Sequence, residues 1–355
     1  MYYRQVKDMV KEALFGKTLK ELQEIVKELG FPAFTAKQIA DWLYKKKVNS
    51  IDDMLNLSKK NREILNKAYH VGLSPFDNVQ ESIDGTRKYL FRTSTQQFIE
   101  AAYIPSENRK TLCVSSQVGC KMGCLFCMTG KQGFQKNLTA GEILNQMVSI
   151  DERDVLTNLV YMGMGEPMDN IDEVLKSLEI ITSDWGFAWS PRRINVSTIG
   201  VVPAMRRFIE ESECHLAISM HSPYNDQRKE LMPIENVYPI EAVIETLKEY
   251  DFGRQRRISF EYIMFEKVND STEHAKELVR LVDGLKSRVN LIKFHPIPDT
   301  PLTGSKHKTM EAFKEVLEKK GIIATIRKSR GEDIYAACGL LSTKKLLKED
   351  KEKDF

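Results

Sequence analysis

The sequence lacks any long apolar stretch. Nowhere in its 355 residues do about 18 consecutive apolar residues occur, so the sequence predicts no membrane-spanning helix. The opening segment MYYRQVKDMVKEALF also contains no apolar core of signal-peptide shape. We therefore expect a cytoplasmic protein with no membrane partner. With 42% hydrophobic residues, the chain is long enough for one large core and a smaller appended domain.

Cysteine is scarce. Six cysteines are too few for a disulfide scaffold in a chain of this length, which argues against a small secreted disulfide-rich protein. Three of them nevertheless stand close together, at Cys120, Cys124 and Cys127. Clustered cysteines in a reducing compartment indicate metal binding or redox chemistry.

An excess of charge of one sign is also lacking. The net charge of +3 neither demands nor excludes a nucleic-acid partner. The distribution is more informative, because residues 1–75 contain 14 Lys and Arg against 9 Asp and Glu. Basic runs occur at Lys45 to Lys47 and at Lys59 to Arg62. Such runs can meet phosphates, but a solvated helix face explains each run equally well.

The first 75 residues carry a helical pattern. Thr18 and Glu21 form a capping-box signal, apolar residues follow at helical spacing, and Gly30 ends the helix. Thr35 with Gln38 repeats the capping signal, and further helical segments follow. We expect a small all-helical domain over residues 1–75. It could be an RNA-docking module or a plain packing domain.

Strand patterns begin after residue 75. Residues 76–105 read as a β-hairpin extension with a turn at Asp84-Gly85. From 106 to 340, strands alternate with helices, which predicts a parallel sheet with crossover helices. The expected strands are 111–116, 157–163, 192–198, 214–220, 257–264, 289–294 and 322–327, and helices are expected at 140–150, 170–182, 239–250 and 271–286. About six such units fall short of a closed eight-unit barrel. The predicted fold is therefore α/β, an open partial (β/α)6 barrel, followed by a charged tail over 341–355.

The cysteine cluster follows the first expected barrel strand as Cys120-Lys-Met-Gly-Cys124-Leu-Phe-Cys127. A structural zinc site uses four ligands, commonly two CxxC pairs, and no second pair follows here. A [4Fe-4S] cluster is ordinarily held by four thiolates, so three leave one iron open to an outside ligand. The spacing favours a cluster of this kind. The alternative is an RNA-binding zinc protein without catalysis, with three cysteines and a histidine as ligands.

A second motif follows the next expected strand, in the segment YMGMGEP that ends at Pro167. Gly165 allows a ligand to approach the backbone, and Glu166 can receive an ammonium group. A strand-to-helix turn without any ligand would use similar residues.

Taken together, these motifs resemble the radical S-adenosylmethionine (SAM) superfamily, and within it the RlmN and Cfr group of RNA adenine methylases. The resemblance extends over almost the whole chain through TLCVSSQVGCKMGCLFCMTGKQGF, MGMGEPMDN, SPRRINVSTIGVVPA, LAISMHSP, LMPI, NDSTEHAKEL and RKSRGEDIYAACG. It implies a [4Fe-4S] cluster on the three clustered cysteines, with SAM bound to the open iron. It also implies methylation of carbon 2 of an adenine in 23S ribosomal RNA, and of adenine 37 in tRNAs. A Cfr-like methylation of carbon 8 is the alternative, although GEP and RGEDIYAACG are more similar to RlmN.

The resemblance gives three further residues a catalytic role. Cys338 matches the cysteine that carries the methyl group, and Cys113 matches the cysteine that resolves the protein–RNA adduct. Glu100 matches the proton acceptor. Considered alone, each cysteine would more often be a small buried hydrophobic residue, and Glu100 a solvated surface residue. Cys214 matches no motif and is expected to be buried.

The SAM-binding residues implied by the resemblance come from four segments. They are Gly165, Glu166, Ser197, Ser219, Met220, His221 and His295. At the last of these positions the chain reads Phe294-His295-Pro296, where the family has Trp-Asn-Pro, and both Asn and His can form hydrogen bonds to a ribose or an adenine. The family also implies an electron donor such as flavodoxin or ferredoxin. We expect a monomer.

Overall fold

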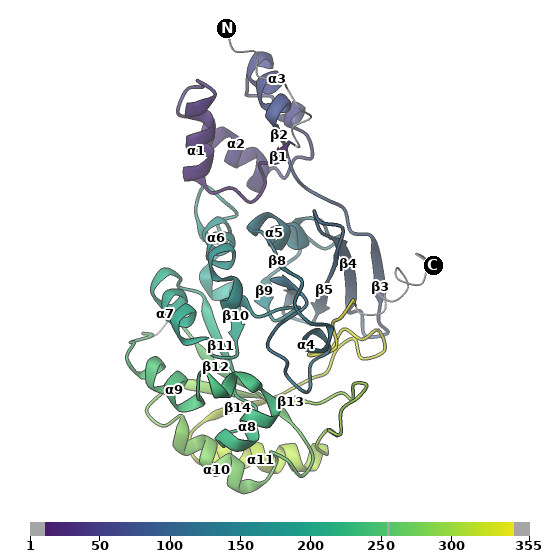
Figure 1. Cartoon of the computed structure of the whole chain (residues 1–355), viewed down its shortest axis with the longest axis vertical. Helices are drawn as coiled ribbons and strands as arrows, with labels where there is room; N and C mark the ends of the chain where they lie inside the picture. The colour runs from purple at the N-terminus through teal and green to yellow at the C-terminus, as the bar shows by residue number, and fades with distance from the viewer. Residues whose placement is uncertain (1–10, 254–255, 344–355) are drawn as a thin grey trace.

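The computed structural model describes residues 11–253 and 256–343 (Figure 1). The part of the charged tail from 344 onward lies outside the described residues. None of the described helices is long and apolar enough to cross a membrane. A small helical module stands at one end of the molecule, and a larger α/β part forms the rest (Figure 1).

The helical module begins as the sequence predicted. In α1 (Leu19–Glu28), Thr18 and Glu21 form both bonds of a capping box, and Gly30 follows with a φ of 69°. The second predicted cap is wrong: Thr35 is the first residue of α2 (Thr35–Ala40) and is buried, and no side chain caps that helix. The reason is that the Thr35 amide donates to the carbonyl of Pro32, so the turn has already started before Thr35.

The other elements of the module are short. The chain continues through a π-helix (Asp41–Lys45), a 3-10 turn (Ile51–Asp53) and α3 (Lys59–Ala68), and strand β1 (Glu12–Ala13) pairs with β2 (Tyr69–His70). The Tyr44 ring packs against Trp185 and Phe187 of the larger part. An ion pair from Lys47 to Asp154, with 3.0 Å between nitrogen and oxygen, adds a second contact.

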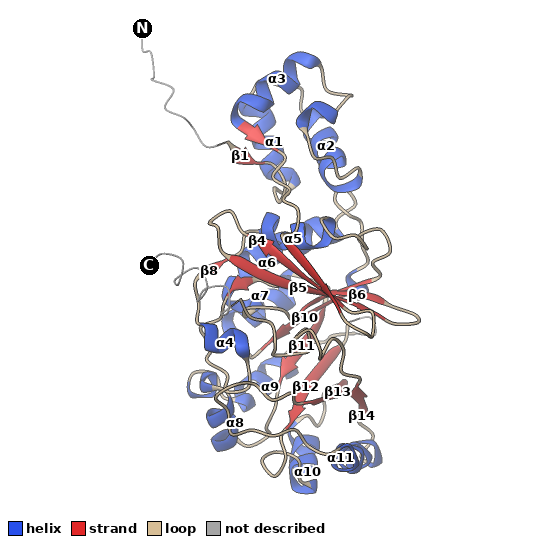
Figure 2. Cartoon of the chain, turned by 90° about the vertical axis from the view of Figure 1, so that its right-hand side faces the viewer, coloured by secondary structure: helices blue, strands red, loops and turns tan. Residues whose placement is uncertain are grey.

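A ten-stranded sheet organises the larger part, in the order β14-β13-β12-β11-β10-β9-β6-β5-β4-β3. Its antiparallel end consists of β3 (Asn78–Glu81), β4 (Arg87–Arg92) and β5 (Phe98–Pro105). Its parallel strands are β6 (Lys110–Cys113), β9 (Asn158–Tyr161), β10 (Ile194–Thr198), β11 (His215–Ser219), β12 (Ile258–Met264), β13 (Ser287–Lys293) and β14 (Ile323–Arg327). A separate pair joins β7 (Gln117–Val118) to β8 (Lys136–Asn137). Figure 2 shows the main strands succeeding one another down the molecule as one twisted layer.

Helices connect the parallel strands. They are α4 (Met128–Gln132), α5 (Ala140–Val148), α6 (Ile171–Thr182), α7 (Val202–Glu211), α8 (Asn225–Leu231), α9 (Ile240–Lys248), α10 (Thr272–Leu281) and α11 (His307–Lys319), with 3-10 turns at Pro167–Asn170, Pro191–Arg193 and Pro233–Asn236. Among the described residues, β14 pairs with β13 alone, so the barrel stays open at that strand. The predicted open partial barrel is therefore confirmed. In such a barrel, the loops at the carboxyl ends of the strands carry the chemistry.

Candidate functional site

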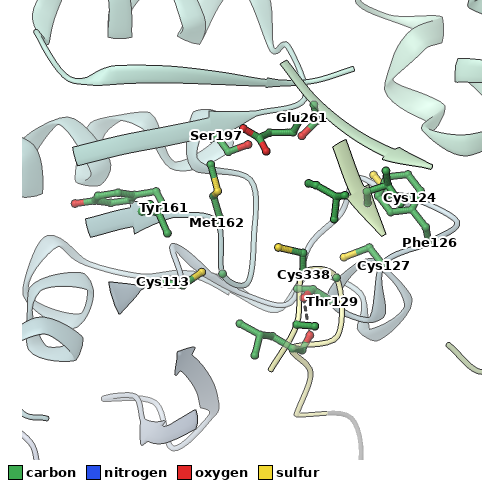
Figure 3. A pocket seen from close by; sticks show the side chains of 18 of the residues that line it. Cys113, Cys124, Phe126, Cys127, Thr129, Tyr161, Met162, Ser197, Glu261 and Cys338 are labelled. Carbon is green, nitrogen blue, oxygen red and sulfur yellow. Dashed lines mark hydrogen bonds between the residues drawn. The ribbon is translucent and has the colours of Figure 1, made fainter. Parts of the chain in front are cut away.

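A pocket lies at the carboxyl ends of the parallel strands, and segments from most of the larger part contribute to it (Figure 3). Eleven of the thirteen residues singled out from the sequence line it: Cys113, Cys120, Cys124, Cys127, Gly165, Glu166, Ser197, Ser219, His221, His295 and Cys338. Met220 is fully buried and Glu100 lies in a neighbouring cavity, so neither lines this pocket. Cys214 is buried, as expected.

The cysteine loop forms one wall of the pocket, between β7 and α4. Cys120 and Cys124 are buried, and Cys127 stands half-buried at the N-cap of α4. The loop turns at Gly119, which has a φ of 70° and where any added Cβ would lie 1.7 Å from the carbonyl oxygen of Gly133. The Leu125 amide donates to the carbonyl of Leu231 at 3.0 Å. The loop is therefore fixed by backbone contacts on both sides.

The chemistry of these thiols fits a metal cluster. Burial raises the pKa of Cys120 to about 12, and burial together with the Cys127 and Cys120 thiols raises the pKa of Cys124 well above its ordinary value. Iron binding would therefore have to displace protons from thiols in this loop. Within the described ranges, no three His, Cys, Asp or Glu side chains are close enough to hold one metal ion. Each thiolate of a cluster binds a different iron atom, so cluster ligands need not converge on a single point.

Glu166 lies deep in the pocket, just after β9. One carboxylate oxygen accepts from the Met168 amide and the other from the Ile199 amide, each at 3.1 Å. Gly165 has a φ of 96°, and a Cβ there would lie 2.5 Å from the Gln117 side chain, so only glycine fits. Burial raises the pKa of Glu166 to about 7. Among the described residues, no Lys or Arg forms an ion pair with this carboxylate that would favour its charged form.

His221 follows β11 and is held rigidly. Its Nδ1 accepts from the Ile263 amide at 3.0 Å, and its ring meets Phe126 edge to face, with 4.7 Å between centroids. Burial lowers its pKa to about 3, so the imidazole is neutral at physiological pH. With Nδ1 used as an acceptor, Nε2 carries the proton and can donate.

His295 is oriented by two polar neighbours. Its Nε2 lies 2.8 Å from the hydroxyl of Ser329, and its Nδ1 lies 3.4 Å from a carboxylate oxygen of Glu332. The side chain still lines the pocket, as the resemblance implied for this position.

The two isolated cysteines reach the pocket from distant parts of the chain. Cys113 is the last residue of β6 and is buried, whereas Cys338 lies in the segment after β14 and is exposed. Both sulfur atoms point into the pocket, from opposite sides in the view of Figure 3. Burial raises the pKa of Cys113 to about 12, with a further contribution from the Cys338 thiol. The two sulfurs are therefore near enough to influence each other.

Glu100 is not the solvated surface residue that its strand position alone suggests. It lies on β5 with 7% of its surface exposed, and it forms an ion pair with Lys88 at 3.0 Å. Its second oxygen accepts from the Ser342 amide at 2.9 Å, four residues beyond Cys338. Burial raises the pKa of Glu100, and Lys88 opposes that rise.

Sequence reasoning missed two charged residues of the pocket. Glu261 on β12 accepts from Asn290 at 2.8 Å and from Arg327 on β14 at 3.2 Å. All seven residues of β12 are buried. A lone carboxylate within the apolar segment ISFEYIM was the signal that could have revealed Glu261, because an unpaired buried charge is costly.

Comparison with known proteins identifies the family. Residues 114–281 match the Radical SAM superfamily, and residues 13–71 match the ribosomal RNA large subunit methyltransferase N-terminal domain. The probable dual-specificity RNA methyltransferase RlmN of Phocaeicola vulgatus is 60% identical over 339 residues, which cover 96% of this chain and 97% of that relative. The chain belongs to the RlmN family.

A more distant relative and a solved structure agree with this assignment. The dual-specificity RNA methyltransferase RlmN of Syntrophus aciditrophicus is 41% identical over 333 residues, which cover 93% of this chain and 96% of that one. The crystal structure of a radical SAM methyltransferase from Sphaerobacter thermophilus superposes with a TM-score of 0.86 at 40% identity, and covers 93% of this chain and 99% of that one. This RlmN family member is thus a radical SAM methyltransferase, and membership of the superfamily implies SAM and a [4Fe-4S] cluster.

Proposed function

We propose that this chain methylates carbon 2 of an adenine in 23S ribosomal RNA, and of adenine 37 in tRNAs. One observation carries the proposal: Cys113 and Cys338 line the same pocket as the three clustered cysteines. A radical SAM enzyme that acts by hydrogen abstraction alone has no need of two additional thiols there. Carbon 2 of adenine is electron-poor and has no nucleophilic lone pair, so it cannot attack SAM directly. A thiolate can accept the methyl group first.

Cofactor binding is assigned to residues on three sides of the pocket. Cys120, Cys124 and Cys127 would hold the cluster, and Glu166 would receive the ammonium group of SAM. The remaining contacts to SAM are assigned to Gly165, Ser197, Ser219, His221 and His295, with Met220 supporting them from behind the wall. When bound, the cluster and SAM supply the radical that removes a hydrogen atom from a methyl group on Cys338.

The two cysteines then divide the remaining steps. The Cys338 thiolate takes a methyl group from one SAM, so a carbon–sulfur bond forms as the sulfonium bond breaks. After hydrogen abstraction, this carbon would bond to carbon 2 of the base, and the adduct would then give up the carbon 2 proton to Glu100 and one electron to the oxidised cluster. The Cys113 thiolate attacks the Cys338 sulfur, and the methylene carbon leaves with a proton as the new methyl group. The resulting disulfide is reduced by an external donor.

We assign to Glu100 the role of taking the proton from carbon 2. Its carboxylate accepts a hydrogen bond from the Ser342 amide, shortly after Cys338 in the chain, and Glu100 lines a separate cavity. Carbon 2 is inaccessible within a paired duplex, and extruding a loop base costs only a few kcal/mol or less. The preferred substrate is therefore an unpaired adenine in a folded RNA.

The remaining parts of the chain are assigned supporting roles. We assign residues 1–75 to RNA docking, 76–105 to a β extension, 106–340 to the catalytic core and 341–355 to a charged tail. A flavodoxin or ferredoxin would supply electrons to the monomeric protein in the cytoplasm.

The deciding experiment is methylation of a 23S ribosomal RNA fragment and of a tRNA by anaerobically reconstituted protein. Mass spectrometry of the released nucleosides locates the methyl group. The expected product is 2-methyladenosine in both RNAs. Formation of 8-methyladenosine would contradict the assignment of carbon 2, and an unmodified tRNA would restrict the activity to ribosomal RNA.

A further inference from the structure

A row of arginines follows the edge of the barrel opposite to the pocket. Arg109 directly precedes β6, Arg192 precedes β10, Arg257 directly precedes β12, and Arg288 is the second residue of β13. These strands run parallel within one sheet, so their amino ends share one edge. The pocket lies at the other end of the same strands. We call these four residues the arginine row.

The arginine row differs from neighbouring arginines in the contacts of its guanidinium groups. Nearby Arg193 donates to the carbonyls of Thr157 and Leu156, which fixes it against the backbone. Arg256 likewise donates to the carbonyls of Ile209 and Phe208. By contrast, the guanidinium groups of the arginine row have no ion pair or hydrogen bond within residues 11–253 and 256–343. Arg109, Arg192 and Arg257 are also exposed.

Within the row, Arg257 lies close enough to Arg288 and to Arg109 for their charges to repel. Burial lowers the pKa of Arg257, and Arg288 and Arg109 lower it further. His215, at the amino end of β11, has its pKa lowered to about 4, first by burial and then by arginines that include Arg257, Arg288 and Arg192. The neutral histidine therefore sits among cations and cannot balance them. Clustered cations at one edge of the sheet create a site for an anionic partner.

The arginine row continues onto the helical module. Arg192 ends the segment whose Trp185 and Phe187 pack against Tyr44 of the module. The Lys47–Asp154 ion pair joins the module to the loop before β9, which starts at the same edge. The helical module therefore contacts the same end of the barrel as the arginine row.

We propose that the arginine row binds the phosphate backbone of the RNA substrate, at a site separate from the catalytic pocket. This inference rests on the proposed function for the identity of the polyanion. From β6 to β13 the row follows five strand intervals along the edge of the curved sheet. Four guanidinium groups on one edge can contact several phosphates of an RNA helix. An acidic electron donor fits less well, because the cysteine loop lies at the opposite end of the strands.

A consequence for substrate size follows from this geometry. An RNA that reaches both ends of the barrel must carry helices beyond the loop that contains the target adenine. A short hairpin can fill the pocket but cannot reach the arginine row. The row is therefore expected to strengthen binding of a long folded RNA and to leave binding of a minimal hairpin unchanged.

The test compares the double variant R257Q/R288Q with a matched control, K276Q/K308Q. The control removes the same charge from exposed lysines on α10 and α11. Binding of fluorescent RNAs to the full-length, cluster-loaded protein is followed by anisotropy over a range of salt concentrations. If each lost arginine met one phosphate, the slope of log Kd against log salt falls by about 1.8, and binding of the long RNA weakens about 60-fold in about 0.1 M salt. The variant R257K/R288K should recover most of the slope.

Three results would overturn the proposal. One is a salt slope for R257Q/R288Q equal to that of the wild type and the control. Another is an equal loss of affinity for the minimal hairpin. The third is weakened binding of an acidic flavodoxin with RNA binding intact. Because binding is measured without turnover, failure of the wild type to methylate any RNA would count against the proposed function alone.

Discussion

The carboxylate of Glu166 provides a quantitative test of the pocket. It is 4% exposed, and burial raises its pKa from an ordinary 4.5 to about 7. At about 1.36 kcal/mol per pH unit, this difference corresponds to about 3 kcal/mol. We therefore expect burial of Glu166 to lower the free energy of unfolding of the wild-type protein by this amount at a pH high enough for Glu166 to be ionised in both the folded and the unfolded state.

The direction of the pH dependence follows from the two protonation states. Below about pH 4.5, Glu166 carries its proton in both the folded and the unfolded protein, and it contributes no pH dependence. Between pH 4.5 and about 7, the unfolded chain loses the proton while the folded chain keeps it, so the free energy of unfolding falls as the pH rises. Above about pH 7, Glu166 is ionised in both states, and the free energy of unfolding falls no further on its account.

Glu166→Gln removes this ionisation. Glutamine has one acceptor oxygen, so the amide of Met168 or Ile199 loses its partner, at a pH-independent cost of about 1 to 3 kcal/mol. The free energy of unfolding of the variant minus that of the wild type should therefore rise by about 3 kcal/mol between pH 4.5 and 8, whatever that constant cost is.

Urea unfolding of the cluster-free protein at several pH values measures this difference. If the free energies of unfolding of wild type and variant changed with pH in parallel, the reasoning from a buried carboxylate would be refuted. In cluster-loaded protein at pH 8, the same substitution should weaken SAM binding about 10- to 100-fold, because a charge-assisted hydrogen bond contributes about 1.5 to 3 kcal/mol. Unchanged SAM affinity would remove Glu166 from the binding site and leave the stability result intact.

Three further outcomes are expected. Cys124→Ala should abolish iron binding and SAM cleavage with little change in circular dichroism, because the barrel core does not depend on the cluster; full iron content would contradict this. Cys338→Ala should form no covalent adduct with RNA, whereas Cys113→Ala should accumulate RNA joined to Cys338 through a methylene bridge, seen as a slow band on denaturing gels. Normal turnover of Cys113→Ala without that band would exclude the two-cysteine mechanism. Lys88→Met should move the acid limb of the pH–rate profile to higher pH, because Lys88 lowers the pKa of Glu100; an unchanged profile would exclude Glu100 from a rate-limiting proton transfer.

Signals that depend on neighbours in sequence predicted the fold well. The capping box at Thr18 and the strand-to-helix alternation both reflect local hydrogen bonding and periodicity, and the parallel sheet follows from them. The wrong prediction of a cap at Thr35 also has a local cause. A turn starts at Pro32, so Thr35 already has a helical backbone and cannot adopt the extended conformation of a capping residue. Chemically plausible residues at the right spacing do not reveal where a helix has already begun.

The residues of the pocket could be predicted from the sequence only in part. The three clustered cysteines are readable because their spacing is local, but the burial of Glu100 depends on Lys88 from a neighbouring strand and on the backbone of Ser342. The Glu261–Arg327 pair likewise joins strands that are not adjacent in the sheet. No pattern within either strand alone specifies such a partner.

The contacts of α4 link the cysteine loop to the segment that carries Cys338. Cys127 is the N-cap residue of this helix, although no side chain caps it, and the first helical amide, from Met128, donates to the carbonyl of Gly339, next to Cys338, at 2.8 Å. The hydroxyl of Thr129 donates to the carbonyl of Leu341 at 2.7 Å. The turn of helix that follows Cys127 therefore fixes the segment carrying the exposed Cys338. Displacement of α4 on loading the cluster would consequently shift Cys338, which couples the two sites through backbone hydrogen bonds that no sequence motif records.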